Sequence, residues 1–306
     1  QYRNAYQEVD HGPLYDAVTK FNGRIDNLEQ IPHLFRAAFR EATTGTPRPV
    51  HLDIAGFTGD ALTPMEGDFD LTVDEAHTRF PAFRPAPDPA VVERAAAAIK
   101  AAKKPVIVAD RGAIIAGAGA ALAALAERIQ APVVATLDAK HIIVETHKLF
   151  RGTVGLYGRG CANHVVDEAD LVIYAGSNTS DHTTANYVMP KQGTKIIQID
   201  IDPLEIGRNY AGTIGMLSDV RAGLEALAAK ADAAKHDDWL AHTQKFVDEW
   251  RTEAEKARAS EAVPMRPERL IRELNEVLPK DAIVIADTGY AALWTGTLLY
   301  LNHPTQ

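Results

Sequence analysis

The sequence predicts an α/β fold built on a doubly wound, mostly parallel sheet, with incomplete α/β pieces at both ends. Short apolar runs rich in β-branched residues recur along the chain, which is typical of strands buried on both faces of a parallel sheet. Longer segments with apolar residues three or four positions apart lie between these runs, and this spacing is typical of amphipathic helices. Regular alternation of the two patterns indicates a parallel sheet covered by helices.

The expected strands are short and apolar almost throughout, and several begin at proline or end near glycine. They occupy residues 49–54, 105–109, 132–136, 171–175, 195–199 and 282–286. Helices are expected at residues 28–43, 89–102, 118–129 and 219–234. The second of these helices has the clearest start signal, because Asp88 can cap its N-terminus and Pro89 suits its first turn.

The order of these segments divides the chain into five parts. Residues 89–230 hold four of the six expected strands and are expected to form a compact central domain. Residues 55–88, rich in glycine and proline, are expected to form an ordered linker, and residues 231–263 a charged helical connector. The two end pieces, 1–54 and 264–306, supply too few elements to bury cores of their own.

Composition narrows the classes of function. The chain has 306 residues, of which 46% are hydrophobic and 24% charged, as in an ordinary globular protein. Its net charge of −9 argues against nucleic-acid binding, because neutralising phosphates needs clustered Lys and Arg. No apolar run approaches the ~20 residues that span a bilayer, so no membrane partner is expected. The start lacks a signal-peptide pattern, and the single Cys161, expected to be a small buried hydrophobe, fits a reducing cytoplasm.

Two motifs could each form part of a nucleotide or anion site. Each can also be explained by local structure without a ligand. Gly155 and Gly158 precede an expected helix, where backbone N–H groups and the helix dipole favour an anion. The alternative there is a tight turn without a ligand. Asp200 and Ile201 end an expected strand, where an acidic residue can hold a ribose hydroxyl. The alternative at that point is the start of a helix, with Asp202 as its N-cap.

Other patterns are less informative. Residues 112–119 contain three glycines after an expected strand, but their spacing differs from that of a dinucleotide-binding turn, so they are expected to allow close helix–sheet packing. The 11 histidines show no metal-ligand spacing. The residues by themselves therefore indicate an α/β protein with a candidate nucleotide or anion site, and the ligand-free alternatives at both motifs stay open.

Three sets of short motifs follow one another along the chain. The first set is YQEVD at 6–10, VTK at 18–20, QIP at 30–32 and PVHLD at 49–53. The second set is PVIV at 105–108, APVV at 131–134, GxxGxxG at 152–158, AN at 162–163, ADL at 169–171 and IDIDP at 199–203. The third set is ADTG at 286–289 with Trp294. In this order they resemble the end of the pyrimidine-binding domain, the central Rossmann-like domain and the start of the diphosphate-binding domain in thiamine-diphosphate (ThDP) enzymes of the acetolactate synthase family.

The resemblance implies a transferase or lyase that uses ThDP and Mg2+ and acts on a small 2-keto acid. In this family a 2-keto acid loses CO2 and the remaining fragment adds to a second carbonyl, with the cofactor as electron sink. ThDP lies between domains of two subunits, so a homodimer or homotetramer is expected. The family's activating glutamate and its metal-binding motif have no counterpart here. No catalytic or metal-binding residue is therefore expected in this chain, which is expected to be a fragment or the ordered part of a longer enzyme.

The resemblance also assigns site residues. Thr288, Gly289 and Tyr290 are expected to contact the ThDP diphosphate through their backbone, because glycine lacks a Cβ and a helix follows. Without the resemblance, a plain strand-to-helix turn would explain the same residues. Tyr6 and Gln7 are expected to lie near the substrate.

The chain departs from the family's pattern at three places. Flavin-dependent members have a glycine triplet where this chain has Ala-Asp-Arg at 109–111, and a loop of basic and acidic residues where it has NTSDH at 178–182. These two departures argue against bound FAD, whereas an ADP-like nucleotide stays open. The third departure, Gly-Tyr-Ala at 289–291 in place of Gly-Gln-His, bears on the substrate subclass. Two alternatives remain: a ThDP-dependent acyl-CoA decarboxylase with an adenine nucleotide in the central domain, and a non-catalytic α/β nucleotide-binding module.

Overall fold

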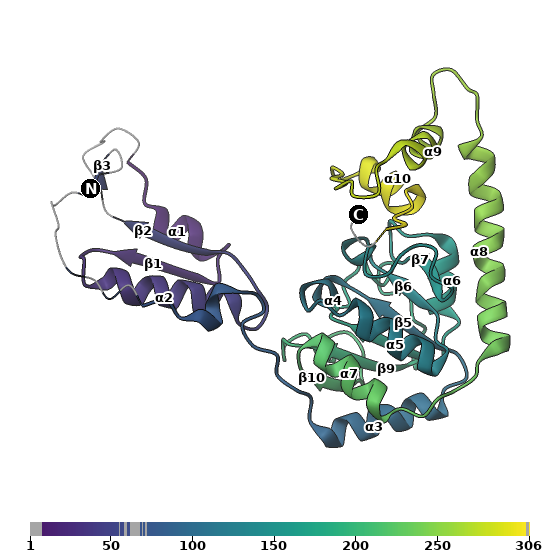
Figure 1. The fold of residues 1–306 in the computed structure, drawn as a ribbon, viewed down its shortest axis with the longest axis horizontal. Helices are drawn as coiled ribbons and strands as arrows, with labels where there is room; N and C mark the ends of the chain where they lie inside the picture. The colour runs from purple at the N-terminus through teal and green to yellow at the C-terminus, as the bar shows by residue number, and fades with distance from the viewer. Residues whose placement is uncertain are drawn as a thin grey trace. The chain divides into compact units, whose positions relative to one another are not determined.

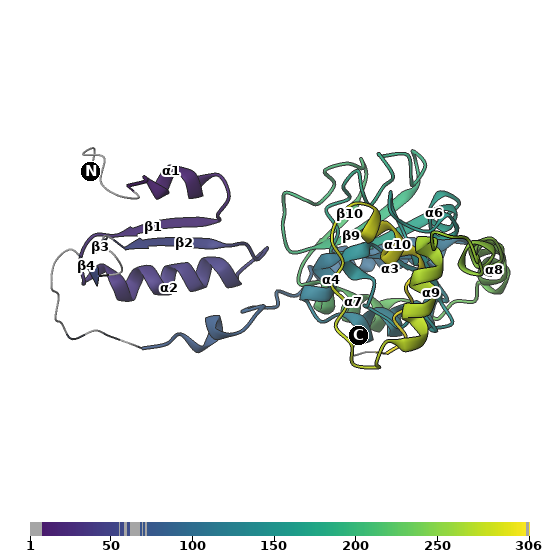
Figure 2. The ribbon, with the colours of Figure 1, turned by 90° about the horizontal axis from the view of Figure 1, so that it is seen from above.

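The computed structural model describes residues 8–54, 56–57, 60–61, 68, 70, 72–303 and 306. The chain forms two compact units, residues 1–84 and 85–306, whose elements are labelled in Figure 1 and Figure 2. The boundary between the units falls inside the expected linker, and the finer division into five parts stays a prediction. In the part of the chain that is described, no helix combines the length and the apolar character needed to cross a membrane.

The second unit is built on a six-stranded sheet. Its strands are β5 (Pro105–Ala109), β6 (Val133–Ala135), β7 (Phe150–Thr153), β8 (Leu171–Ala175), β9 (Lys195–Asp200) and β10 (Ile214–Leu217). The strand order is β10-β9-β8-β5-β6-β7, and every neighbouring pair is parallel. The chain therefore winds outward in both directions from the β5–β8 pair, which confirms the predicted doubly wound α/β fold.

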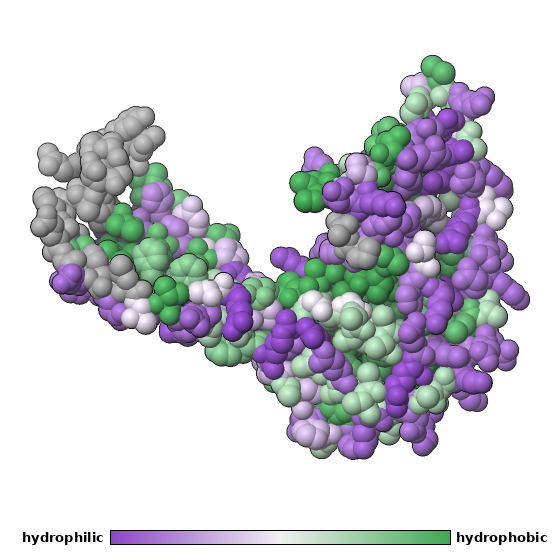
Figure 3. Space-filling model, in the orientation of Figure 1, coloured by the Kyte–Doolittle hydropathy of each residue, from purple (hydrophilic) through white to green (hydrophobic). Residues whose placement is uncertain are grey.

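Helices cover both faces of this sheet (Figure 1). One face carries α3 (Pro89–Ala101), α4 (Arg111–Ile115), α5 (Gly119–Ile129) and α7 (Val220–Lys230). The other face carries α6 (Gly160–Asp167) and the long α8 (Asp237–Arg258). The outward side of α8 is mostly hydrophilic, as Figure 3 shows, because only its inner stripe contacts the sheet layer.

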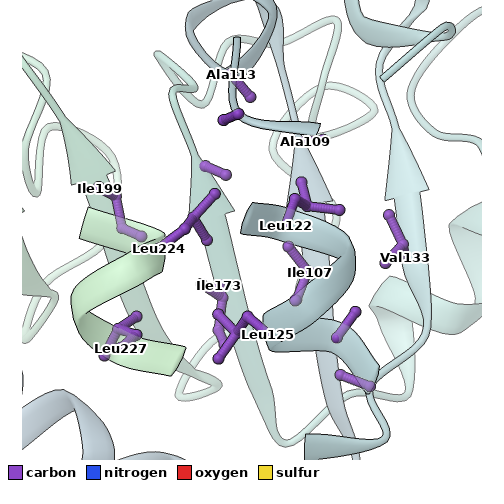
Figure 4. Packing of buried hydrophobic residues seen from close by; sticks show 14 of the residues in the cluster. Ile107, Ala109, Ala113, Leu122, Leu125, Val133, Ile173, Ile199, Leu224 and Leu227 are labelled. Carbon is purple, nitrogen blue, oxygen red and sulfur yellow. The ribbon is translucent and has the colours of Figure 1, made fainter. Parts of the chain in front are cut away.

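The core follows from the alternation of side chains along each strand. On β5, Ile107 joins the cluster under α5 and α7, whereas Val106 and Val108 join the cluster under α6 and α8. Figure 4 shows the first cluster, in which Leu122 and Leu224 point from the helices onto the strands. A strand that is apolar on both faces is thus buried on both faces, as the sequence pattern indicated.

Most predicted elements of this unit are confirmed. Asp88 caps α3 as expected, and its carboxylate accepts a hydrogen bond from the Ala90 N–H at 2.8 Å. The predicted strand at 282–286 is wrong, because these residues are not in a strand and the side chains of Ile283 and Ile285 are 85% and 91% exposed. An apolar run forms a strand only where a neighbouring strand can pair with its N–H and C=O groups, and no described strand lies alongside this one.

The last part of the second unit holds α9 (Pro267–Val277) and α10 (Tyr290–Leu298). Ile271, Leu298 and Leu299 form a small buried cluster there, against which Trp250 of α8 packs. A 3-10 turn, η2 (Leu137–Ala139), follows β6 and faces α10. This small core joins α10 to α8 and α9, while η2 contacts α10 from the side of the central sheet.

The first unit is smaller and less buried. Its main elements are α1 (His11–Asp16), β1 (Phe21–Ile25), α2 (Gln30–Thr43) and β2 (Val50–Ile54), with β1 parallel to β2. Short elements follow: β3 (Gly56–Phe57), β4 (Asp60–Ala61) and the 3-10 turn η1 (Glu75–Thr78). The crossover helix α2 joins the two parallel strands, as a βαβ connection requires.

Candidate functional site

Two loops meet where the strand order reverses, which is the place where open α/β sheets bind ligands. Gly112 follows β5 and Gly176 follows β8, and the Gly112 N–H donates to the Gly176 carbonyl at 3.0 Å. A Cβ on Gly112 would lie 2.7 Å from the Gly176 Cα, and Gly176 has a φ of +67°. The two backbones are therefore in direct contact, and they close the opening between β5 and β8.

A buried carboxylate holds the loops around this point together. Asp110 accepts hydrogen bonds from Thr136 Oγ1 at 2.6 Å, Ser177 Oγ at 2.7 Å, Thr183 Oγ1 at 3.3 Å and the Arg111 N–H at 2.7 Å. Burial raises the pKa of Asp110, while these hydrogen bonds act in the opposite direction. The cluster fixes the loops that follow β5, β6 and β8, and its four donors saturate the carboxylate.

The structure assigns the glycines of the β7 loop to contacts within the chain. A Cβ on Gly155 would overlap the His182 carbonyl, and a Cβ on Gly158 would lie 2.6 Å from the Thr153 carbonyl. The Asn163 amide closes this turn, since it accepts from the Gly155 N–H at 2.9 Å and donates to the Gly155 carbonyl at 3.1 Å. The close approaches that require glycine here are thus made by the protein's own backbone.

Asp200 ends β9 at the same edge of the sheet, and Ile201 follows it. Burial raises the pKa of Asp200 from 3.8 to about 6, and the Asp202 N–H donates to its carboxylate at 2.9 Å. Three strands, β8, β5 and β6, separate β9 from β7. The structure therefore does not bring Asp200 next to Gly155 and Gly158.

The alternative interpretation of Asp202 as the N-cap of a helix is wrong. Residues 203–207 form turns, and the Asp202 carboxylate accepts from the Leu204 N–H at 2.9 Å. An Asp side chain that bonds to the backbone two residues on makes a local turn, which competes with helix formation.

The turn expected to meet a diphosphate lies at the N-terminus of α10. Gly289 caps this helix with a φ of +73°, and no atom lies within 4 Å of a Cβ placed on it. Tyr290 is 72% exposed, and its ring stacks on Trp294 with the ring centroids 5.5 Å apart. The first N–H groups of a helix have no carbonyl partner inside it, so this exposed end suits an anion.

The remaining sequence predictions have mixed outcomes. Cys161 is buried as expected, and burial raises the pKa of its thiol to about 11, which makes it a poor nucleophile. Tyr6 and Gln7 lie outside the described residues. The Asp110 cluster was not predicted, although a polar residue at or just beyond the end of three apolar runs, at 110, 136 and 177, was visible in the sequence.

Comparison with known proteins places these features in a family context. The family model described as the thiamine pyrophosphate enzyme, central domain, matches residues 92–227. A probable acetolactate synthase large subunit of Methanocaldococcus jannaschii is 35% identical over 304 residues, which is 95% of this chain and 50% of that protein. The acetolactate synthase isozyme 1 large subunit of Escherichia coli K12 is 30% identical over 303 residues, covering 99% of this chain and 52% of the relative.

A glyoxylate carboligase of Escherichia coli O157:H7 is 27% identical over 308 residues, covering 98% of this chain and 50% of the relative. The chain thus spans about half the length of the curated relatives it matches.

Proposed function

Because the chain belongs to the acetolactate synthase family of ThDP enzymes, we propose that it is part of a carboligase or decarboxylase, a transferase or lyase acting on a small 2-keto acid. The observation that carries this proposal is the exposed N-terminus of α10 behind Gly289, which offers backbone donors to a diphosphate. The names of the relatives favour this function over an acyl-CoA decarboxylase or a non-catalytic module.

In this proposal the chain's own residues bind and orient. The backbone N–H groups of Gly289 and Tyr290 hold the diphosphate, and the dipole of α10 adds to the attraction. The Thr288 N–H, which donates to the Asp287 carboxylate at 2.8 Å, joins them by exchanging that partner for the diphosphate. Trp294 packs beneath Tyr290 and keeps the first turn in place. Bound ThDP would supply the electron sink for decarboxylation. We propose Mg2+ as the counter-ion of the diphosphate, held by residues that this chain does not supply.

For the central domain, we propose that no flavin is bound. The support for this is the direct contact of Gly112 with Gly176 and the saturated Asp110 carboxylate, which together fill the point where the strand order reverses. An adenosine nucleotide remains a proposal for the end of β9, where Asp200 would accept from a ribose hydroxyl beside Ile201. If Asp200→Ala does not change the affinity for an adenine nucleotide, the proposed nucleotide site at the end of β9 is wrong. Flavin absorbance in the purified enzyme would refute the proposal that no flavin is bound.

The experiment that tests the main proposal replaces Gly289 in an enzyme of the relatives' full length that carries this chain. Gly289→Val places a branched side chain where the backbone must approach the diphosphate, so calorimetry with Mg2+ present should show ThDP binding weakened by roughly 1–3 kcal/mol. Gly212→Val is the matched control, because Gly212 has a φ of +74° and equally open surroundings. Equal ThDP affinity in the two variants would remove the α10 turn from the cofactor site.

Two further expectations concern the assembly. We propose a homodimer or homotetramer with sites shared between subunits, so light scattering that finds an active monomer would refute this arrangement. The 306-residue chain by itself is expected to bind no ThDP, because the activating glutamate and the metal-binding motif of the family have no counterpart in it. Micromolar binding by this chain in calorimetry would contradict that expectation.

A further inference from the structure

The C-terminal end of α10 has an unusual set of partners. The last four carbonyl groups of a helix have no N–H partner within it, and here a side chain of another element donates to each of them, although the Thr295 carbonyl also accepts from the Leu299 N–H at 3.2 Å. Lys140 Nζ donates to the Thr295 carbonyl at 3.2 Å and to the Gly296 carbonyl at 2.5 Å. Arg159 Nε donates to the Thr297 carbonyl at 2.7 Å, and Arg258 Nη1 to the Leu298 carbonyl at 2.8 Å.

All three donor residues are buried and basic, and together we call them the α10 clamp: Lys140, Arg159 and Arg258. They come from the end of η2, the N-cap of α6 and the last residue of α8. The buried carboxylate of Glu145 accepts two hydrogen bonds from Arg159, at 2.8 and 2.9 Å, and lies 3.5 Å from Lys140. One carboxylate thus serves two cations, and the remaining positive charge faces the negative end of the helix dipole.

The helix is also seated directly against the central domain. A Cβ on Gly296 would overlap the end of the Leu137 side chain in η2, so a larger residue here would require Leu137 to move. Thr153 Oγ1, at the end of β7, donates to the same Gly296 carbonyl at 3.1 Å. The position of α10 is therefore set at its C-terminal end by the loops that follow β6 and β7.

We propose that Lys140 is a positioning residue for the ThDP diphosphate, and that the α10 clamp fixes the helix so that its exposed N-terminal turn keeps the orientation needed to bind. This inference rests on the proposed function. The nine residues of α10 span about 13 Å, so the clamp at one end cannot touch a diphosphate at the other. Its effect on the cofactor must pass through the helix.

Stability alone does not explain a lysine at this position. Burial lowers the pKa of Lys140 to about 7, which means that burying the ammonium group opposes folding. Removing one partner of a buried ion pair usually destabilises a protein, because the other charge is left uncompensated. Here Arg159 still pairs with Glu145 without Lys140. Thr153 Oγ1 and the Leu299 N–H still donate to the Gly296 and Thr295 carbonyls. A lysine kept for stability only would therefore tolerate methionine with no effect on the cofactor.

The test is Lys140→Met in an enzyme of the relatives' full length, with ThDP affinity measured by calorimetry in Mg2+. We expect the Kd for ThDP to rise about fivefold or more, with an unchanged or raised Tm. In the 306-residue chain, hydrogen exchange at residues 291–298 should become faster. Lys148→Met is the matched control, because Lys148 lies in the same connection between β6 and β7 but is 72% exposed and pairs with Glu127.

Each outcome has a distinct meaning. Faster exchange with an unchanged Kd, or no change in either, overturns the positioning role and leaves the proposed function intact. Absence of ThDP binding in the unmodified enzyme overturns the proposed function itself. If Lys140→Met does not fold, Thr153→Val removes another donor to the Gly296 carbonyl at nearly constant volume, and the same rise in Kd is expected.

Discussion

Strands β8 and β2 have the same length and the same parallel pairing, yet their surroundings differ. β8 has neighbours on both sides, β5 and β9, and all five of its residues are buried. Among the described residues β2 pairs only with β1, and none of its five residues is buried. An apolar side chain on a strand therefore stabilises the fold according to what covers it, more than by its intrinsic strand propensity.

The same contrast separates the two units. The second unit has two extended core clusters, one on each face of its sheet. In the described part of the first unit, Ile25 and Ala38 are the only buried hydrophobic residues, while Leu14, Val18 and Phe39 are more than half exposed. Because burial of apolar area is the main stabilising term, the free energy of unfolding should be concentrated in the second unit.

The largest expected effect comes from two matched isoleucines. Ile173 on β8 is fully buried, so Ile173→Ala should lower the free energy of unfolding of the second unit by about 4 kcal/mol. Ile54 on β2 is 51% exposed, and Ile54→Ala should cost less than about 1 kcal/mol in the first unit. Urea denaturation followed by tryptophan fluorescence reports on the second unit, which holds all three tryptophans, and hydrogen exchange at residues 21–25 reports on the first. Similar losses at the two positions would contradict the comparison.

A somewhat smaller effect is expected from two aspartates. Asp110→Ala leaves buried hydroxyls of Thr136 and Ser177 without their acceptor, which should cost about 3 kcal/mol in the same urea experiment. Asp53→Ala on β2 is the control, because that side chain is 29% exposed and lies 3.7 Å from the nearest ring nitrogen of His11, beyond hydrogen-bond distance. A loss below ~1 kcal/mol for Asp110→Ala would mean that water replaces the carboxylate at this point.

The sequence predicted the central strands because their apolar runs are uninterrupted. It missed β7 and β10 for a physical reason: β7 contains the charged Arg151, and β10 contains Gly215 at its second position. Arg151 is nevertheless buried, since the carbonyls of Lys148 and Phe150 accept from its guanidinium group. A charged side chain can be buried when groups inside the protein accept its hydrogen bonds. The sequence alone does not distinguish such a residue from a charged residue on the surface.

Parts of the candidate functional site could be predicted from the sequence only where their residues are neighbours in the chain. The turn at residues 287–290 was visible because its glycine and the following helix adjoin. The Asp110 cluster and the α10 clamp were not, because their members come from separate loops that the order β8-β5-β6-β7 brings together. Sheet order is a tertiary property, and the local pattern of a single sequence does not determine it.

The smallest expected change in stability concerns Asp200, a buried carboxylate at the end of β9 in the second unit. Burial raises its pKa from 3.8 to about 6, and the nearby Glu205 and Asp202 act in the same direction. Between about pH 4 and pH 6 the folded protein therefore holds a proton at this site that the unfolded chain has lost. The stability contributed by this group is complete below about pH 4 and falls as the pH rises to about 6.

We expect this fall to amount to about 2–3 kcal/mol, since each pKa unit corresponds to about 1.4 kcal/mol, and to disappear in Asp200→Asn, whose amide does not titrate. The measurement is the urea midpoint at several pH values between 4 and 7, read by tryptophan fluorescence and compared as the difference between the two proteins. That difference should be near zero at about pH 4 and should favour Asp200→Asn at pH 7. Asp26→Asn, at a side chain that is 59% exposed in the first unit, is the control and should leave the pH dependence of the second unit unchanged. A difference in urea midpoint that stays constant across the pH range would show that water reaches Asp200 freely. The end of β9 would then be less buried than β8.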